Sequence, residues 1–155
     1  MANPTALKLL IFGGNGVLGT AIANKFKAEG YEVTFGVRKV TNSADQFQLP
    51  LTDEPVPELL KGQLFDSVVF AQGANNNDSV INYSSDDLNR LFEANVTFIS
   101  QTTKALILHN LVKHKGKIVV LSSFWEQVTR QEKMSYTITK AAVGGLVRSM
   151  AVDLG

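Results

Sequence analysis

The sequence contains no cysteine, so disulfide bonds and thiolate metal sites are excluded. It also lacks an excess of one charge: 15 Lys and Arg residues stand against 14 Asp and Glu residues, a net charge of +1. This balance gives no electrostatic reason to expect nucleic acid or a membrane as the main partner, although a local site for a small anion is compatible with it. The apolar run at residues 9–12 is too short for a signal sequence or a membrane span. The two histidines, His109 and His114, lie near a predicted helix end and are interpreted as surface residues rather than metal ligands. We therefore expect a cytoplasmic protein without a metal.

The 155 residues, 45% of them hydrophobic, suffice for one domain with a buried core. Apolar runs bounded by turn residues predict strands at residues 7–12, 31–37, 47–49, 65–71 and 116–121. Helical spacing predicts helices at 17–28, 87–113 and 134–154, with a helical turn near 58–61. Gly30 is placed to end the first helix, and residues 85–87 are placed to cap the second. This alternation predicts one α/β domain, residues 1–155, with a doubly wound parallel sheet.

A glycine-rich turn joins the first predicted strand to the first predicted helix, with Gly13, Gly16 and Gly19 in G-x-x-G-x-x-G spacing. One glycine makes the tight turn, a second lets the backbone approach a pyrophosphate, and a third lets helix and strand pack closely. The phosphates would lie on the free N–H groups of the helix start. A turn that binds nothing is the alternative, because a glycine motif alone is weakly specific.

The end of the second predicted strand carries Arg38 and Lys39 and no carboxylate. Proteins that bind NAD at such a turn tend to have an acidic residue there, and those that bind NADP tend to have a basic one. Arg38 could hold a ribose 2′-phosphate through charge-assisted hydrogen bonds. The pair therefore favours NADP(H) over NAD(H). The alternative is that Arg38 and Lys39 are only the solvated end of a strand.

Tyr136 and Lys140 stand four residues apart at the start of the last predicted helix, which places them on one face. A lysine ammonium beside a phenol favours the phenolate, so such a tyrosine can act as acid or base on a carbonyl or alcohol near neutral pH. This spacing alone occurs often by chance. Here, however, Ser123 follows a predicted strand thirteen residues before Tyr136.

At this point the sequence resembles the short-chain dehydrogenase/reductase family, from Lys8 to the C-terminus. The resemblance rests on five motifs in order: the turn at residues 13–19, Phe70-Ala71-Gln72-Gly73 after the fourth strand, Asn95 in Glu93-Ala94-Asn95-Val96, residues 117–123 with Ser123 at the end, and Tyr136 to Lys140. It implies a Rossmann-like fold with strand order 3-2-1-4-5. It also implies that a carbonyl and an alcohol are interconverted by hydride transfer with a nicotinamide cofactor.

The resemblance implies roles for individual residues. Tyr136 would be the proton donor or acceptor, and Lys140 would favour its ionised form and bind the nicotinamide ribose. Ser123 would hydrogen-bond the substrate carbonyl oxygen, and Asn95 would hold a water that continues the proton path to Lys140. The cofactor would be bound by residues after the first, second and fourth strands and by the last helix, namely Gly13, Asn15, Gly16, Val17, Leu18, Gly19, Arg38, Lys39, Ala71, Gln72, Gly73, Tyr136 and Lys140.

Several of these residues have a second interpretation. Ser122 competes with Ser123, but only Ser123 has the family spacing. Asn95 could be simply a polar residue of a long helix. Phe124 and Trp125 could line a substrate pocket or belong to the core.

The sequence departs from the family pattern in three places. The asparagine of the motif after the fourth strand is replaced, although Gly73 is kept, and Pro50 stands near the place of an aspartate that contacts adenine. The segment between the second and fourth strands is short, so we expect a reduced helix there. The last departure is the largest, because the family continues with further strands and a substrate-covering segment where this chain ends at Gly155. The fifth strand would then be an unpaired edge. Either a partner subunit supplies the cover, or the sequence is incomplete.

We therefore expect an NADPH-dependent oxidoreductase that acts on a small-molecule carbonyl or alcohol. The resemblance implies a homo-oligomer in which helices 87–113 and 134–154 pack across a dimer interface. The small residues Ala141, Ala142, Gly144 and Gly145 would permit close contact there, or they could pack on the chain's own sheet. The alternative function is a nucleotide-binding protein without turnover, or an inactive short member of the family.

Overall fold

The computed structural model describes residues 6–41, 43–51 and 55–155. The chain forms two compact units. We call Met1–Gln72 with Gln101–Leu121 the sheet unit, and Gly73–Ser100 with Ser122–Gly155 the helical unit. That residues 1–155 act as a single domain stays a prediction.

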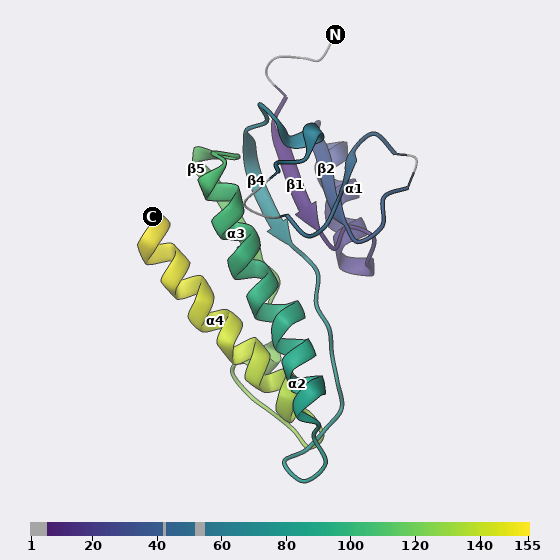
Figure 1. The fold of residues 1–155 in the computed structure, drawn as a ribbon, viewed down its shortest axis with the longest axis vertical. Helices are drawn as coiled ribbons and strands as arrows, with labels where there is room; N and C mark the ends of the chain where they lie inside the picture. Colours follow the sequence, from purple (N-terminus) through teal and green to yellow (C-terminus); the bar gives the residue numbers. More distant parts are fainter. Residues whose placement is uncertain (1–5, 42, 52–54) are drawn as a thin grey trace. The chain divides into compact units, whose positions relative to one another are not determined.

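The sheet unit holds five parallel strands in the order β3-β2-β1-β4-β5 (Figure 1). Its elements are β1 (Lys8–Phe12), α1 (Val17–Ala28), β2 (Glu32–Val37), β3 (Gln46–Gln48), the single turn η1 (Glu58–Leu60), β4 (Phe65–Phe70), most of α3 (Phe98–Leu108) and β5 (Val112–Val120). The predicted α/β class and strand order are confirmed. Between β3 and β4, the described residues form only the turn η1, as the short sequence predicts.

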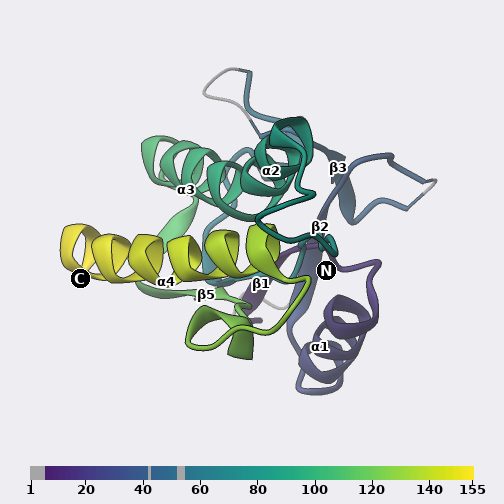
Figure 2. The ribbon, with the colours of Figure 1, turned by 90° about the horizontal axis from the view of Figure 1, so that it is seen from below.

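Both faces of the central strands are covered, which explains why these strands are apolar. Alternate residues of a strand point to opposite faces. Leu9 and Ile11 of β1 pack with Ala23 of α1 on one face. On the other, the Phe12 ring stacks on Phe70, with ring centroids 4.9 Å apart. Figure 2 shows α1 and α3 on opposite sides of the strands.

Helix α1 has the predicted bounds, because its last turn is closed by a glycine. Gly30 adopts a φ of +85° and donates its N–H to the Lys27 carbonyl, while the Tyr31 N–H reaches the Phe26 carbonyl. This is the Schellman arrangement, in which a left-handed residue satisfies the last carbonyls. The Phe26 and Tyr31 rings then meet edge to face at 4.8 Å.

The predicted helix over residues 87–113 is wrong in extent. Its C-terminal part, α3, ends at Leu108, and β5 begins already at Val112. The reason is a second Schellman ending, in which Asn110 has a φ of +53° and the Leu111 N–H bonds the Leu106 carbonyl. His109 therefore lies beyond the helix, and His114 lies in an exposed part of β5.

The helical unit contains α2 (Ser85–Phe92), the π-helical turn η2 (Glu93–Thr97), the start of α3, the turn η3 (Phe124–Glu126) and α4 (Met134–Leu154). The predicted single helix is thus three segments, with a π turn in the middle. Ser84, one residue before the predicted region, caps α2 by accepting the Asp87 N–H. The bounds predicted for α4 are confirmed.

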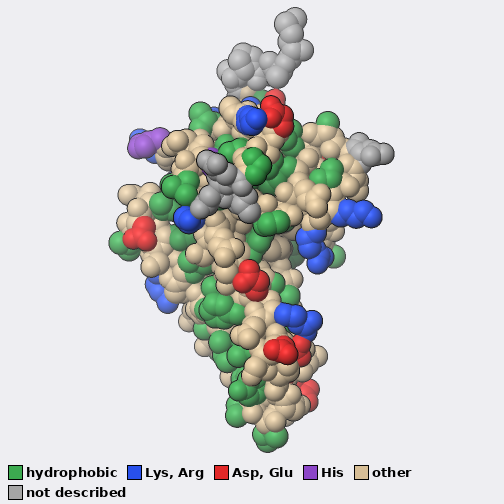
Figure 3. Space-filling model, in the orientation of Figure 1, with side chains coloured by type: hydrophobic (Ala, Val, Ile, Leu, Met, Phe, Trp, Pro, Cys, Tyr) green, Lys and Arg blue, Asp and Glu red, His purple; other side chains and the backbone are tan. Residues whose placement is uncertain are grey.

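Strand β5 pairs only with β4 among the described residues, so the predicted sheet edge is present. Its side chains are mostly exposed or half-buried, Val119 included. On the face shown in Figure 3, cationic and anionic side chains are interspersed rather than gathered by sign. Within the described part of the chain, no helix is both long and apolar enough to cross a membrane.

Candidate functional site

The glycine turn is at the carboxyl ends of the central strands. Phe12, which precedes the turn, pairs with Gly36 in β2 and with Phe70 in β4. Residues that follow these strands therefore emerge at one edge of the sheet. In open α/β sheets this edge, at the switch between strand orders, is where ligands bind.

Two glycines are required by the packing of the turn itself. Gly13 has a φ of +76°, and a Cβ on it would lie 2.5 Å from the Gln72 backbone nitrogen. A Cβ on Gly19 would lie 2.1 Å from the Gly13 carbonyl oxygen. Both contacts are with backbone, which cannot rotate away. Gly13 and Gly19 thus perform the turn and close-packing roles predicted for the motif.

Gly16 is different, because the protein itself does not need a glycine there. A Cβ on Gly16 would meet only the Gly13 carbonyl oxygen, at an ordinary 3.4 Å, and its φ of −82° suits any residue. No side chain caps α1 at this residue. The next two residues, Val17 and Leu18, are 89% and 62% exposed. Open space before an uncapped helix start fits a bound phosphate.

The neighbouring strand ends carry the remaining predicted cofactor residues of this unit. Arg38 and Lys39 follow β2, and both are exposed. Ala71 and Gln72 follow β4, and the Gln72 side-chain amide is buried without a hydrogen-bond partner among the described residues. An unsatisfied buried amide is costly, so it suits a site that a polar ligand completes.

The helical unit holds the four predicted catalytic residues. Tyr136 and Lys140 lie one turn apart on α4, with the Lys140 Nζ 5.7 Å from the centroid of the Tyr136 ring. Lys140 is 4% exposed. Burial lowers the pKa of Lys140, and the nearby Glu126 carboxylate raises it in part, so that the net pKa is below the ordinary value.

Asn95, in the π turn, is 1% exposed and has its amide fully engaged. Its Oδ1 accepts the Ala74 N–H at 2.7 Å, and its Nδ2 donates to the Ala74 carbonyl at 2.9 Å and to Thr139 Oγ1 at 3.0 Å. Thr139 in turn donates to the Tyr136 carbonyl at 2.9 Å. A Cβ on Gly73 would lie 3.4 Å from Asn95 Oδ1 and 3.7 Å from Lys140 Nζ. The Asn95 side chain is thus a clamp within the helical unit, and is not simply an outward-facing polar residue of a long helix.

Ser123 begins the turn η3, where its Oγ accepts the Trp125 N–H at 3.3 Å. Phe124 is 74% exposed and so is not a core residue. The Trp125 ring is half-buried, with the Arg130 guanidinium 5.7 Å from its centroid. The turn η3 packs against α4, so Ser123 and Tyr136 belong to contacting elements.

Sequence reasoning missed three charged residues around α4. The Glu126 carboxylate lies over Gly144, where an added Cβ would be 2.3 Å from Glu126 Oε1. Gly144 is therefore covered by its own chain rather than free for a partner, and the homo-oligomer stays a prediction. Lys133 and Asp78, both buried, lie at the helix start. In the sequence, the only signal for Lys133 is a charge close to the Tyr136 motif, and the only signal for Asp78 is a charge directly after three asparagines.

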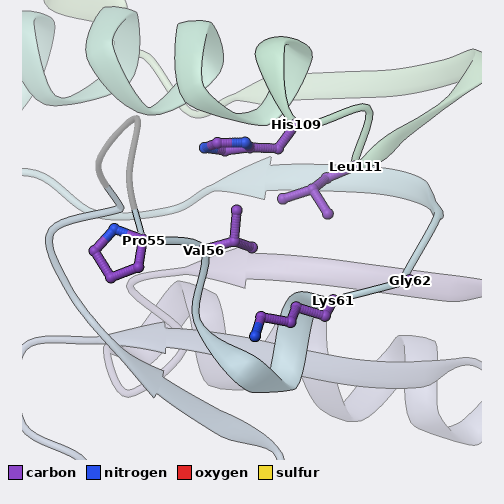
Figure 4. A pocket seen from close by; sticks show the side chains of 6 residues that line it. All are labelled: Pro55, Val56, Lys61, Gly62, His109 and Leu111. Atoms are coloured by element: carbon purple, nitrogen blue, oxygen red, sulfur yellow. The ribbon is translucent and has the colours of Figure 1, made fainter.

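A surface hollow of about 450 Å³ lies within the sheet unit (Figure 4). Pro55, Val56, Lys61, Gly62, His109 and Leu111 line it. Because Gly62 precedes β4 and Leu111 precedes β5, the hollow is at the amino ends of these strands. That is the edge opposite to the glycine turn. Among residues 6–41, 43–51 and 55–155, no three His, Asp or Glu side chains gather as a metal site would require.

The family model described as Enoyl-(Acyl carrier protein) reductase matches residues 60–155, more than half of the chain. Oxidoreductase UcpA of Escherichia coli is 32% identical over 76 residues, which are 48% of this chain and 29% of that protein. Gluconate 5-dehydrogenase of Gluconobacter oxydans is 33% identical over 73 residues, 47% of this chain and 28% of that protein. The matches thus span less than a third of these relatives.

A crystal structure of a short chain dehydrogenase family protein from Francisella tularensis superposes with a TM-score of 0.81 at 18% identity. The superposition covers 97% of this chain and 64% of that one. At this identity the likeness concerns the fold alone. Together with the matched family model, it leads to one conclusion: the chain belongs to the short-chain dehydrogenase/reductase family of oxidoreductases.

Proposed function

We propose that the protein is an NADPH-dependent oxidoreductase that interconverts a carbonyl and an alcohol, with Tyr136 as the proton donor or acceptor. The observation that carries the proposal is the pairing of Tyr136 with a buried Lys140 on one face of α4. A buried ammonium beside a phenol stabilises the phenolate, and a phenol that can lose and regain a proton serves as a general acid or base.

The sheet unit would hold the dinucleotide. Its pyrophosphate would lie on Gly16 and the uncapped start of α1, where an added Cβ finds open space. Arg38 and Lys39 would hold the ribose 2′-phosphate, and the unpaired amide of Gln72 would gain a partner. When bound, the cofactor would supply or accept the hydride.

In the helical unit, Ser123 would hydrogen-bond the oxygen of the reacting carbonyl. Lys140 would keep Tyr136 ready to exchange its proton with that oxygen. Asn95 would have a positioning role. Its three hydrogen bonds to Ala74 and Thr139 fix the segment at Gly73 and Ala74, which approaches Lys140. We also propose that a water molecule near Asn95 continues the proton path to Lys140.

The proposal is tested by a Tyr136→Phe variant, with Tyr83→Phe as the matched control. Loss of the hydroxyl should abolish NADPH consumption across a panel of aldehydes and ketones, while NADPH still enhances its fluorescence on binding. Tyr83→Phe should behave as wild type. If the wild-type protein binds NADPH but no carbonyl is turned over, the protein instead binds nucleotide without catalysis.

The cofactor preference is tested by Arg38→Ala, with the exposed Arg148→Ala as the control for net charge. A charge-assisted hydrogen bond contributes about 1.5–3 kcal/mol, so NADPH affinity should fall about tenfold to a hundredfold. NADH affinity should stay within about twofold, because NADH lacks the 2′-phosphate. Equal losses for both dinucleotides, or wild-type preference for NADH, would contradict the assignment of Arg38.

A further inference from the structure

Helix α4 has no cap from its own sequence neighbours. Its N-cap residue is Lys133, and no side chain caps the helix at that position. The first N–H groups of a helix have no partner within it, so they need acceptors from elsewhere. Asp78 supplies two of them: its carbonyl oxygen accepts the Met134 N–H at 3.2 Å, and its Oδ1 accepts the Ser135 N–H at 2.9 Å. Asp78 is 3% exposed, so these bonds are sheltered from water.

The Lys133 ammonium holds the segment before Asp78. It donates to Asn75 Oδ1 at 3.0 Å, to the Asn76 carbonyl at 3.4 Å and to Asn77 Oδ1. These three acceptors match the three N–H donors of a lysine ammonium. Asn76 Nδ2 also donates to Asp78 Oδ2 at 3.2 Å, which joins the two charged groups into one cluster.

Asp78 stays ionised in spite of its burial. Burial raises the pKa of Asp78. Hydrogen bonds from Ser135 and Asn76 and the charge of Lys133 together lower the pKa by more than burial raises it, so the net pKa lies below the ordinary value. Buried charges are costly unless they are paired and hydrogen-bonded. A solvated helix start would need neither a paired charge nor these hydrogen bonds. The cluster therefore fixes the first turn of α4 relative to residues 75–78.

That geometry includes Tyr136, the third residue of α4. The Lys133 and Lys140 ammonium nitrogens each lie 5.7 Å from the centroid of its ring. Its carbonyl is bonded by Thr139, which Asn95 holds from the π turn. Tyr136 is therefore fixed by the Asp78 and Lys133 cluster at the helix start and by Asn95 one turn later.

We propose that Asp78 and Lys133 are positioning residues, which set the first turn of α4 and thereby the place of Tyr136 by tying that turn to residues 75–78. The proposal rests on the proposed function in one respect, that Tyr136 exchanges the proton. Neither residue touches the reacting atoms. Asp78 replaces the local cap that α4 lacks with an acceptor 57 residues away in sequence from Ser135, and Lys133 holds the residues before Asp78.

The test uses Asp78→Ala, with Asp153→Asn as the control because Asp153 is an exposed carboxylate on the same helix. The first readout is hydrogen exchange of the Ser135 amide, which loses its acceptor. Loss of a charge-assisted bond should speed this exchange about tenfold or more in Asp78→Ala. Asp153→Asn should leave it unchanged. In Asp78→Asn an acceptor oxygen remains, so most of the protection should return.

The second readout is fluorine NMR of protein labelled with fluorotyrosine. The chain contains three tyrosines, so three signals are expected. Tyr136→Phe identifies the Tyr136 signal. In Asp78→Ala that signal should move by more than its line width, while those of Tyr31 and Tyr83 stay in place. Where turnover is measurable, kcat should fall about tenfold with the KM for NADPH unchanged, and Asp78→Asn should recover most of it.

Unchanged Ser135 exchange in Asp78→Ala would overturn the capping role. Faster exchange with an unmoved Tyr136 signal would overturn the positioning role. If Asp78→Ala does not fold, Lys133→Met decides by the exchange readout, because loss of the three ammonium donors should release residues 75–77 and speed exchange of the Ser135 amide; unchanged exchange would overturn the role of Lys133. A wild-type protein without turnover would end the proposed function, yet the exchange and fluorine readouts would still decide this proposal.

Discussion

Adding one methyl group to Gly19 should mainly lower the stability of the fold, whereas adding one to Gly16 should mainly weaken the binding of NADPH. In Gly19→Ala the new Cβ would lie 2.1 Å from the Gly13 carbonyl oxygen and 2.8 Å from the Gly14 Cα. An ordinary contact of this kind is about 3.3 Å or more, so helix and turn must separate by about 1 Å. Overpacking of this severity costs about 3 kcal/mol of unfolding free energy. For a chain of 155 residues that corresponds to a melting temperature lower by about 6–12 °C.

In Gly16→Ala the new Cβ meets only the Gly13 carbonyl oxygen, at 3.4 Å, and the backbone conformation suits alanine. Alanine is a poorer N-cap than glycine, so the unfolding free energy should fall by less than about 1 kcal/mol. The methyl group would occupy the space proposed for the phosphate, so the Kd for NADPH should rise about tenfold or more.

Urea unfolding followed by circular dichroism gives the first quantity, and fluorescence titration with NADPH gives the second. Gly16→Ala that binds NADPH as tightly as wild type would refute the placement of the pyrophosphate. Gly19→Ala that unfolds like wild type would refute the close packing of the turn.

Further predictions concern the helical unit. Asn95→Ala removes the buried amide that bonds both the N–H and the carbonyl of the half-buried Ala74, so the unfolding free energy should fall by about 2–4 kcal/mol in urea unfolding. A loss below about 1 kcal/mol would contradict this role of Asn95. In Glu126→Gln the pKa of Lys140 should fall further, because the Glu126 carboxylate now raises that pKa against the effect of burial. The alkaline limb of the pH profile of kcat/KM should therefore move to lower pH. An unmoved limb would contradict the electrostatic pairing of Glu126 with Lys140. The folded-state pKa of Asp78 lies below 3.8, so its stabilisation is present above pH 3.8 and is lost as the pH falls through that lower value. Wild type should therefore lose more unfolding free energy than Asp78→Asn on going from about pH 5 to about pH 2.5, as acid titration of stability would measure.

The features that local chemistry decides could be predicted from the sequence. The bounds of α1 follow from apolar spacing and from Gly30, the one residue type that enters the left-handed region at no cost. The strand order follows from the family resemblance, which itself rests on residues at fixed spacing. The glycine turn was predicted with two of its roles, because tight turns and close packing leave no alternative to glycine.

The end of α3 depends on a single residue. Asn110 ends α3 after Leu108, and the prediction carried the helix on to residue 113 because asparagine is a weaker signal than glycine. The π turn around Asn95 leaves no mark in the apolar pattern. The apolar spacing therefore predicts one regular helix through these residues.

The sequence by itself determined the family, the strand order, and the positions of Tyr136 and Lys140 on one helical face, because these depend on residues close together in the chain or at characteristic spacing. Only the tertiary structure decided what surrounds them. Asp78 caps a helix 57 residues away, and Glu126 covers Gly144 on α4. No local propensity encodes such pairs, because each exists only when separate segments pack and the cost of burying a charge is offset by a partner.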